Sequence, residues 1–180
     1  MDELFTRRSV RSYLSTPVEE QKLLRVLEAG AYAPSAMNNQ DRQFTAIANA
    51  DILSELNLAV KSLSDSQTVE RIEGRLGGSF SFFYNAPVLI VVSHFPTSLA
   101  PAPDCAVALE NMFLCAKSMG LGTCWINQLN NLCSNPKIRE ILTKAGVNPE
   151  HDVFGCCAIG YSETEGTLLK EKQSKIVICK

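Results

Sequence analysis

The segment from Asp104 to Met119 is apolar on almost every side when it is read as a helix. Asp104 is a typical N-terminal cap and Gly120 a typical stop. The polar side chains between them fall in a narrow stripe at positions 110, 111, 117 and 118. A helix of this kind must be buried on nearly every side. In a chain of 180 residues, it belongs at the centre of a domain or in a subunit interface.

The rest of the chain alternates between helical and extended patterns. Helices are expected over residues 2–7, 17–32, 50–64 and 136–145, and strands over 43–49, 88–93, 123–127 and 153–161. A capping box at Thr16-Pro17-Val18-Glu19 would begin the second of these helices at Pro17. Residues 65–85 fit neither pattern clearly, and residues 176–179 could form a last short strand. The interleaving predicts an α/β or α+β fold in a single domain over residues 1–180.

Three arginines stand within the five residues from Arg7 to Arg11, although the whole chain has 17 basic and 19 acidic residues. A tight basic cluster on a slightly acidic chain favours a local anion site over a nucleic-acid surface. Guanidinium groups match phosphate oxygens in pairs and do not lose their proton. A solvated basic helix end would give the same pattern, so the cluster alone leaves both interpretations open.

The seven cysteines do not form the pattern of a disulfide framework or a zinc site. Their number is odd, no C-x-x-C is present, and only two histidines could join a metal site. We therefore expect buried, reduced thiols and no metal. Cys156 and Cys157 are adjacent, so on a strand they would point to opposite faces.

Side chains for acid–base or nucleophilic catalysis are not apparent either. No serine or cysteine near His94 or His151 stands in a nucleophile motif, so both histidines are expected to be structural or exposed. No apolar run approaches the ~18 residues that span a bilayer. The N-terminus has no signal-peptide core. We expect a cytoplasmic protein with no catalytic side chain and no membrane partner.

Several short motifs follow one another along the chain: R-R-S-x-R at 7–11, P-S-x-x-N-x-Q at 34–40, G-L-G-T-C-W-I at 120–126, I-G-Y at 159–161 and K-x-K at 170–172. Each has an ordinary interpretation, as a turn, a helix end or an exposed lysine pair. In this order, and with the long apolar helix before the third, they resemble the FMN-dependent nitroreductase family. The resemblance runs from about residue 3 to residue 173.

The resemblance implies an α+β fold with a central, mostly antiparallel sheet flanked by helices. It also implies an intertwined homodimer in which FMN lies at the interface and is touched by both chains. The apolar helix at 104–119 would then pack against its dimer mate. Residues 176–179 would extend onto the sheet of the partner subunit.

Carried over to this sequence, the resemblance implies three groups of cofactor contacts. The FMN phosphate and ribityl chain would be held by Arg7, Arg8, Ser9 and Arg11, with Lys170 and Lys172 near the same phosphate. The flavin of the other subunit would be touched by Pro34, Ser35, Ala36 and Asn38. The isoalloxazine would be lined by Trp125, Ile126 and Asn127, with a backbone N–H near flavin N5.

Two positions depart from the pattern of the family. Many relatives have Pro-Trp after Gln40, whereas this chain has Asp41-Arg42, and the residue after Asn127 is often glycine, whereas here it is Gln128. A side chain at Gln128 would narrow the flavin face and affect substrate access. No flavin contact of the family matches residues 65–85, which would instead shape the substrate pocket through Phe80 to Tyr84.

The activity implied by the resemblance is that of an oxidoreductase. NADH or NADPH would deliver a hydride to flavin N5 and leave, and a nitroaromatic, a quinone or a related small-molecule acceptor would then be reduced. Other interpretations are an ene-type reductase, a dehalogenase or a flavin-consuming enzyme on the same fold. A non-catalytic flavin carrier or redox sensor, and a phosphate-binding module without flavin, belong to different classes.

Overall fold

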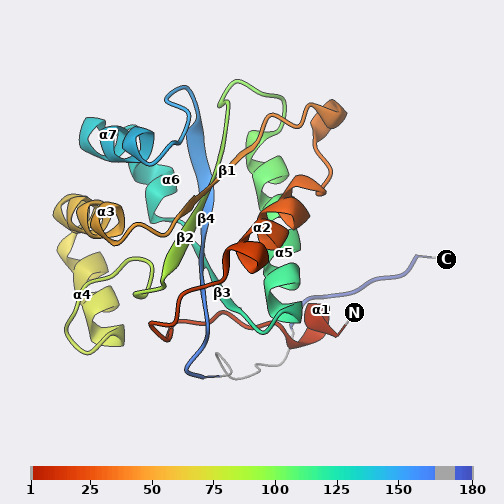
Figure 1. The fold of residues 1–180 in the computed structure, drawn as a ribbon. Coiled ribbons are helices and arrows are strands. Elements are labelled where there is room, and N and C mark those ends of the chain that lie inside the picture. Colours follow the sequence, from red (N-terminus) through yellow and green to blue (C-terminus); the bar gives the residue numbers. More distant parts are fainter. Residues whose placement is uncertain (1, 165–172, 180) are drawn as a thin grey trace.

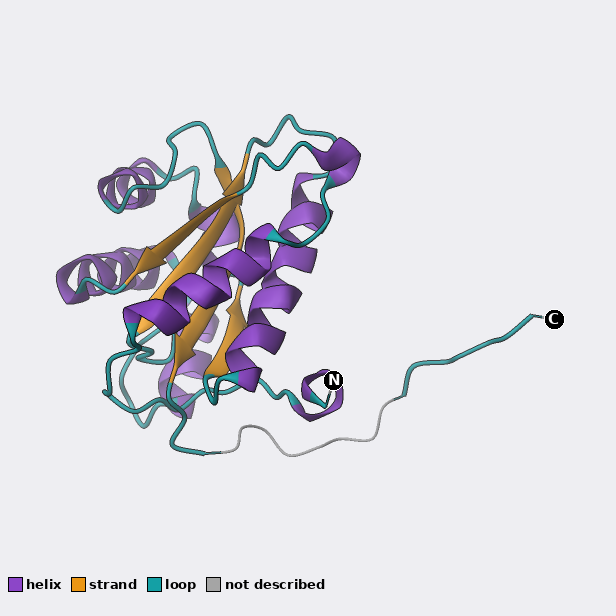
Figure 2. Cartoon of the chain, turned by 45° about the vertical axis from the view of Figure 1, so that its right-hand side comes forward, coloured by secondary structure: helices purple, strands orange, loops and turns teal. Residues whose placement is uncertain are grey.

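The computed structural model describes residues 2–164 and 173–179. In this part of the chain, four strands form one antiparallel sheet in the order β1-β2-β4-β3. The strands are β1 (Gln43–Ile47), β2 (Val88–His94), β3 (Gly122–Ile126) and β4 (Asp152–Gly160). Helices cover both faces of the sheet (Figures 1 and 2). The predicted α+β fold with an antiparallel sheet is therefore confirmed.

One face of the sheet is covered by α2 (Glu20–Ala31) and α5 (Pro101–Ser118), and the other by α3 (Ala50–Leu63), α4 (Ser66–Arg75), α6 (Gln128–Leu132) and α7 (Pro136–Lys144) (Figure 2). The short α1 (Glu3–Thr6) contacts α5, and a 3-10 turn, η1 (Ala36–Asn38), precedes β1. No helix in the described residues is both long and apolar enough to cross a membrane.

Alternation along the central strands creates two hydrophobic cores, one on each face of the sheet. Leu89 and Val91 of β2 belong to one core, and Ile90 and Val92 belong to the other. Both β2 and β4 are buried almost throughout, as expected for strands covered on two sides. Cys156 and Cys157 lie in opposite cores, which confirms the prediction made from their adjacency.

The start of α5 differs from the prediction. The helix begins at Pro101 rather than at Asp104, because proline lacks the N–H that the first helical turn leaves unpaired. Asp104 therefore lies inside the first turn, 6% exposed, and does not cap the helix. Within one chain α5 is also not buried all round, since the Val107 side chain is 41% exposed.

The predicted start of α2 was also wrong. The helix begins at Glu20, and Glu19 makes no capping hydrogen bond. Its carboxylate instead accepts the hydroxyl of Tyr161 at 2.7 and 2.9 Å, and it lies 3.8 Å from the amine of Lys22. The capping box therefore does not form, because a partner distant in sequence occupies its glutamate.

Residues 65–85 contain a helix that the pattern did not predict. In α4 only Ile72 is buried, and few apolar residues mark the helix in the sequence. Its N-terminal cap is Asp65, which accepts the Thr68 N–H at 2.8 Å. The expectation that Phe80 to Tyr84 shape a substrate pocket stays a prediction; all five residues are buried within the chain, and Phe82 is fully so. Of the five, Tyr84 lines a cavity.

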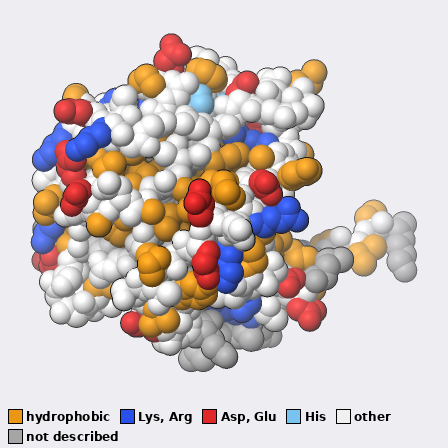
Figure 3. All heavy atoms as spheres, in the orientation of Figure 1, with side chains coloured by type: hydrophobic (Ala, Val, Ile, Leu, Met, Phe, Trp, Pro, Cys, Tyr) orange, Lys and Arg blue, Asp and Glu red, His pale blue; other side chains and the backbone are white. Residues whose placement is uncertain are grey.

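The C-terminal segment from Ile176 to Cys179 forms no strand within the chain. Its apolar side chains are 71–87% exposed, and the segment projects away from the body of the molecule (Figures 1 and 3). Its extension onto a partner sheet stays a prediction. Lys170 and Lys172 lie outside the described residues.

Candidate functional site

The N-terminal arginines lie beside the strand that follows α5. The backbone N–H of Val10 donates to the Thr123 carbonyl at 2.9 Å, and Ser9 forms a parallel bridge with Thr123. This close approach needs glycine at position 122, because a Cβ atom there would lie 2.8 Å from Val10. The sequence therefore fixes the arginine segment along β3 through a small residue in the G-L-G-T motif.

A Schellman-type turn leads from α5 into β3. Gly120 has a φ of 77°, which favours glycine, and its N–H donates to the Lys117 carbonyl at 3.1 Å. The Leu121 N–H donates to the Ala116 carbonyl at 2.9 Å. This turn places Lys117 and the backbone of the turn next to the arginine segment.

A first cavity of about 410 Å³ opens between these elements. It is lined by three cations, Arg7, Arg8 and Lys117, together with residues 120–123 and 162–164. The Arg7 guanidinium lies 5.4 Å from the ring centre of Phe113, and Arg8 donates to the Phe5 carbonyl at 2.8 Å. The lining also holds one acid, Glu163, and Arg7 lies 3.7 Å from the Glu110 carboxylate. A concave surface with three cations and one acid is suited to a phosphate or another small anion.

A second cavity of about 590 Å³ lies at the other end of the arginine segment. Its lining includes four residues of the predicted site: Arg11, Trp125, Ile126 and Asn127. The Trp125 side chain is 40% exposed and meets Phe113 edge to face, with ring centres 6.1 Å apart. Since Phe113 also contacts Arg7, one buried ring of α5 connects the walls of both cavities.

Two cations of the second cavity, Arg71 and Arg75, were not predicted. Arg75 donates to the Tyr84 hydroxyl at 3.2 Å, and the Arg11 guanidinium lies 5.7 Å from the Tyr84 ring centre. The spacing of Arg71 and Arg75, four residues apart, would have placed them on one helix face if α4 had been recognised.

Gln128, which departs from the family pattern, lies at the rim of the same cavity. Its side-chain oxygen accepts the backbone N–H of Asn127 at 3.2 Å. The Gln128 side chain therefore pairs with the backbone N–H of Asn127, which is a donor in the segment that was expected to face a flavin ring.

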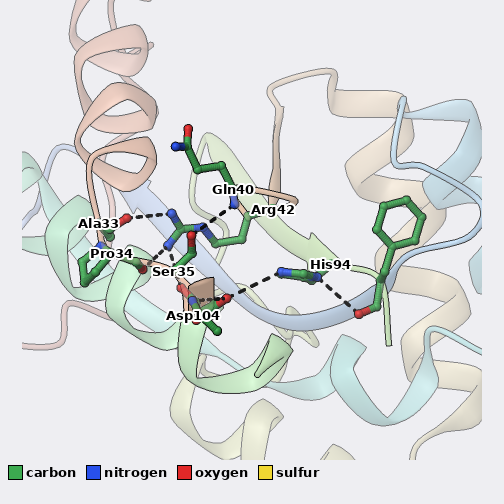
Figure 4. Close-up of polar contacts among 9 residues, drawn as sticks. Ala33, Pro34, Ser35, Gln40, Arg42, His94 and Asp104 are labelled. Carbon is green, nitrogen blue, oxygen red and sulfur yellow. Dashed lines mark hydrogen bonds and ion pairs between the residues drawn. The ribbon is translucent and has the colours of Figure 1, made fainter. Parts of the chain in front are cut away.

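The loop with the P-S-x-x-N-x-Q motif is fixed by side chains from two other segments (Figure 4). The Arg42 guanidinium donates to three carbonyls, those of Ala33 at 2.7 Å, Pro34 at 2.9 Å and Asp104 at 3.0 Å. The Asp104 carboxylate accepts the Ala36 N–H with both oxygens, at 3.0 and 3.1 Å. Arg42, the second departure from the family pattern, is thus a structural part of this loop.

The same loop has an unusual backbone. Met37, Asn38 and Gln40 all have φ between 52° and 57°, a region that few residues other than glycine adopt. The Ser35 hydroxyl accepts the Gln40 N–H at 3.1 Å, and the Gln40 side chain donates to Asn38 at 3.0 Å. Such a conformation persists where surrounding contacts determine it, as Arg42 does here.

The structure does not bring all predicted site residues together. Arg7 lies beside Glu110 and Phe113 of α5, and Trp125 meets the same Phe113, whereas Pro34, Ser35, Ala36 and Asn38 lie at the N-terminal end of α5 beside Asp104. From Asp104 to Phe113 the helix rises about 14 Å. None of these four loop residues lines either cavity.

The two histidines are buried together, away from both cavities. The His94 Nε2 lies 3.8 Å from the Asp104 carboxylate (Figure 4). The His151 ring packs against Phe95 with ring centres 4.3 Å apart. Burial lowers the pKa of His151. Within the described residues no group of histidines, cysteines and carboxylates is arranged to hold a metal ion, and all seven cysteines are free.

The chain is similar to known proteins over most of its length. A profile of the Nitroreductase family matches residues 4–161. A protein of Archaeoglobus fulgidus with the provisional name NADH dehydrogenase/NAD(P)H nitroreductase is 27% identical over 168 residues, covering 90% of this chain and 84% of that protein. A nitroreductase structure from Bacteroides fragilis with bound FMN is 42% identical, with a TM-score of 0.87 and coverage of 99% and 97%. A nitroreductase from Desulfitobacterium hafniense with bound FMN, 24% identical, has the same fold with a TM-score of 0.87.

Proposed function

The chain belongs to the nitroreductase family, and we propose that it is an oxidoreductase that holds FMN and uses NADH or NADPH to reduce nitroaromatics, quinones or related acceptors. The observation that carries the proposal is the pair of cavities at the two ends of the Arg7–Arg11 segment. One offers cations for a phosphate, and the other offers an exposed indole and polar groups for a flat ring. The names of the similar proteins support the same cofactor and reductant.

The first cavity fits the phosphate of FMN by the chemistry of its donors. Arg7, Arg8 and Lys117 supply three positive charges against the one acid of the lining, Glu163, and a phosphate monoester carries nearly two negative charges at neutral pH. We assign Arg7, Arg8 and Ser9 to the phosphate and ribityl chain. Lys170 and Lys172, outside the described residues, would approach the same phosphate.

The second cavity fits the ring end of FMN. Trp125, Ile126 and Asn127 supply a flat edge and backbone donors, and Arg11 supplies a cation. A fixed cation and an N–H donor stabilise negative charge on a reduced flavin. The Asn127 N–H becomes available to the ring once the Gln128 side chain, which now accepts it, rotates away.

When bound, FMN supplies the two-electron chemistry, because its N5 can take a hydride from the reduced nicotinamide and return the electrons to an acceptor. The protein orients the participants and fixes the charges around them. We assign no catalytic side chain, since neither histidine lines either cavity.

Two copies of the chain are needed for a complete site in this proposal. Pro34, Ser35, Ala36 and Asn38 line neither cavity of their own chain, so a partner subunit would bring them to the flavin. The described surface also has large exposed hydrophobic side chains on and around α1, α2 and α5: Leu4, Phe5, Tyr32, Met37 and Val107. An apolar surface of this kind is typical of an interface.

The cofactor is tested by the visible spectrum of the purified protein, before and after addition of FMN and removal of the excess. Flavin bands that bleach with NADH or NADPH under anaerobic conditions, and return with a quinone, are the expected result. Bleaching without turnover of an acceptor would indicate a non-catalytic flavin carrier. Purified protein that retains no flavin, even after FMN is added, would contradict the FMN assignment. Mass measurement in solution should give twice the chain mass of 19.7 kDa.

A matched pair of variants tests the phosphate contacts. R7Q/R8Q removes two charges from the first cavity and should weaken FMN binding at least tenfold. K137Q/K144Q removes two charges from α7, whose residues do not line either cavity, and should leave the affinity unchanged. Equal loss in both variants would show a general charge effect and contradict the assignment.

A further inference from the structure

We propose that the second cavity selects electron acceptors that carry a negative charge next to their reducible ring, and that Arg71 and Arg75 bind that charge. The proposal rests on the proposed function and names the substrate class of the same site. The two arginines come from α4, which contributes nothing to the cavity assigned to the FMN phosphate.

The charge of the cavity wall favours an anion. Arg11, Arg71 and Arg75 line it, and Asp65 is the one acid among the lining residues. The two Asp65 oxygens accept the backbone N–H and the hydroxyl of Thr68, each at 2.8 Å. Both Asp65 oxygens are therefore used to cap α4, so this carboxylate neutralises the charges of Arg71 and Arg75 only in part.

The placement of Arg71 and Arg75 is unfavourable for the helix itself. Two like charges four residues apart on one helix face repel each other. In the described part of the chain neither arginine forms an ion pair within 4.0 Å. Of the two acids of α4, Glu73 is paired with Lys61 at 2.8 Å, and Glu70 forms no ion pair within 4.0 Å with a described residue. An anionic ligand in the cavity would relieve this repulsion.

The geometry also places an aromatic surface beside these charges. Arg75 is oriented by its hydrogen bond to the Tyr84 hydroxyl, and the Trp125 side chain is 40% exposed in the same cavity. Asn131 and Gln128 add polar groups to the lining. A flat ring with a carboxylate or sulfonate at its edge matches this combination.

The phosphate of FMN does not account for Arg71 and Arg75. Three other cations, Arg7, Arg8 and Lys117, form a separate cavity for it at the opposite end of the arginine segment. The reduced dinucleotide also carries phosphates, so it is a second source of the same charge. The experiment must therefore separate the acceptor from both the cofactor and the reductant.

The test compares 4-nitrobenzoate with methyl 4-nitrobenzoate, which differ in the negative charge. Trp125 is the only tryptophan in the chain, so quenching of its fluorescence reports binding in the cavity without any turnover. The unmodified protein should bind the acid at least tenfold more tightly than the ester. R71Q/R75Q should lose this preference, and K137Q/K144Q on α7 should keep it.

Steady-state kinetics give the second readout. In R71Q/R75Q, kcat/KM for 4-nitrobenzoate should fall about tenfold while the value for the ester stays within twofold. High salt should reduce the preference of the unmodified enzyme in the same direction. Equal use of acid and ester by the unmodified enzyme would overturn the proposal.

Two further outcomes would also overturn it. A fall in FMN affinity in R71Q/R75Q would assign the arginines to the cofactor, and slower anaerobic bleaching by NADH or NADPH would assign them to the reductant. If no acceptor is reduced at all, the proposed function fails, but Trp125 quenching still decides whether the cavity prefers the anion.

Discussion

The carboxylate of Asp104 accepts the backbone N–H of Ala36 with both oxygens, at 3.0 and 3.1 Å, across 68 residues of sequence. This contact attaches the loop before β1 to the first turn of α5. Since α5 also lines the first cavity through Lys117 in its last turn, one helix relates the positions of the loop and of that cavity.

Replacement of Asp104 by alanine should destabilise the protein by about 1–3 kcal/mol, because it leaves the Ala36 N–H without its acceptor. Urea unfolding measures the change. D104N keeps one acceptor oxygen and should lose less than D104A. D41A, which removes an exposed neighbouring carboxylate, is the control and should be within about 0.5 kcal/mol of the unmodified protein. A D104A variant as stable as D41A would contradict the role of the contact.

Arg42→Ala should loosen the loop, since one guanidinium satisfies the carbonyls of Ala33, Pro34 and Asp104. Arg42→Lys keeps the charge, but an ammonium group lacks the planar fork of donors that reaches three carbonyls. We therefore expect it to loosen the loop nearly as much as Arg42→Ala does. Amide exchange of residues 34–40 should accelerate in both variants. In the proposed dimer, the affinity for FMN should also fall in both variants, while amide exchange in α7 stays unchanged. Normal exchange of the loop in R42A would show that Arg42 is dispensable.

Replacement by alanine should change the stability of the protein in opposite directions at two glycines, Gly122 and Gly74. A Cβ at Gly122 would lie 2.8 Å from Val10, so G122A should cost about 1–3 kcal/mol and displace the arginine segment. A Cβ at Gly74, within α4, would meet nothing within 4 Å, so G74A should stabilise the protein by about 0.4–1 kcal/mol. Thermal unfolding of both variants, with FMN binding of G122A, is the measurement. If G122A changes neither the thermal stability nor FMN binding, β3 and the N-terminal segment can move apart without cost.

Acid should destabilise the protein through His151. Burial lowers the pKa of this residue in the folded state, so the unfolded chain binds a proton more readily near pH 6. The stability present above the unfolded pKa of about 6.5 should therefore decline as the pH falls towards the lower folded value. Urea unfolding at pH 7.5 and 5.5 tests this, and H151Q should reduce the difference. An unchanged difference in H151Q would assign the acid sensitivity to other groups.

Local sequence patterns determined most of the secondary structure. The strands at β1, β2, β3 and β4, and the helices α3 and α7, were predicted within a few residues, because buried faces impose periodicity on the sequence. The alternation at Cys156 and Cys157 was enough to assign them to opposite cores. The helix α4 has few apolar residues and only one buried residue, Ile72, and it was missed.

The arrangement of the site was decided by contacts between distant segments. The sequence predicted that Arg7, Arg8 and Arg11 form an anion site. It did not predict that Arg71 and Arg75 would join Arg11, since that depends on how α4 packs.

The sequence likewise marked Asp104 as a helix cap and Glu19 as part of a capping box. Tertiary contacts gave both carboxylates other partners, Ala36 and Tyr161. Short-range patterns report local backbone preference and burial. A polar side chain, in contrast, binds the nearest available partner, and only the folded chain determines which partner that is.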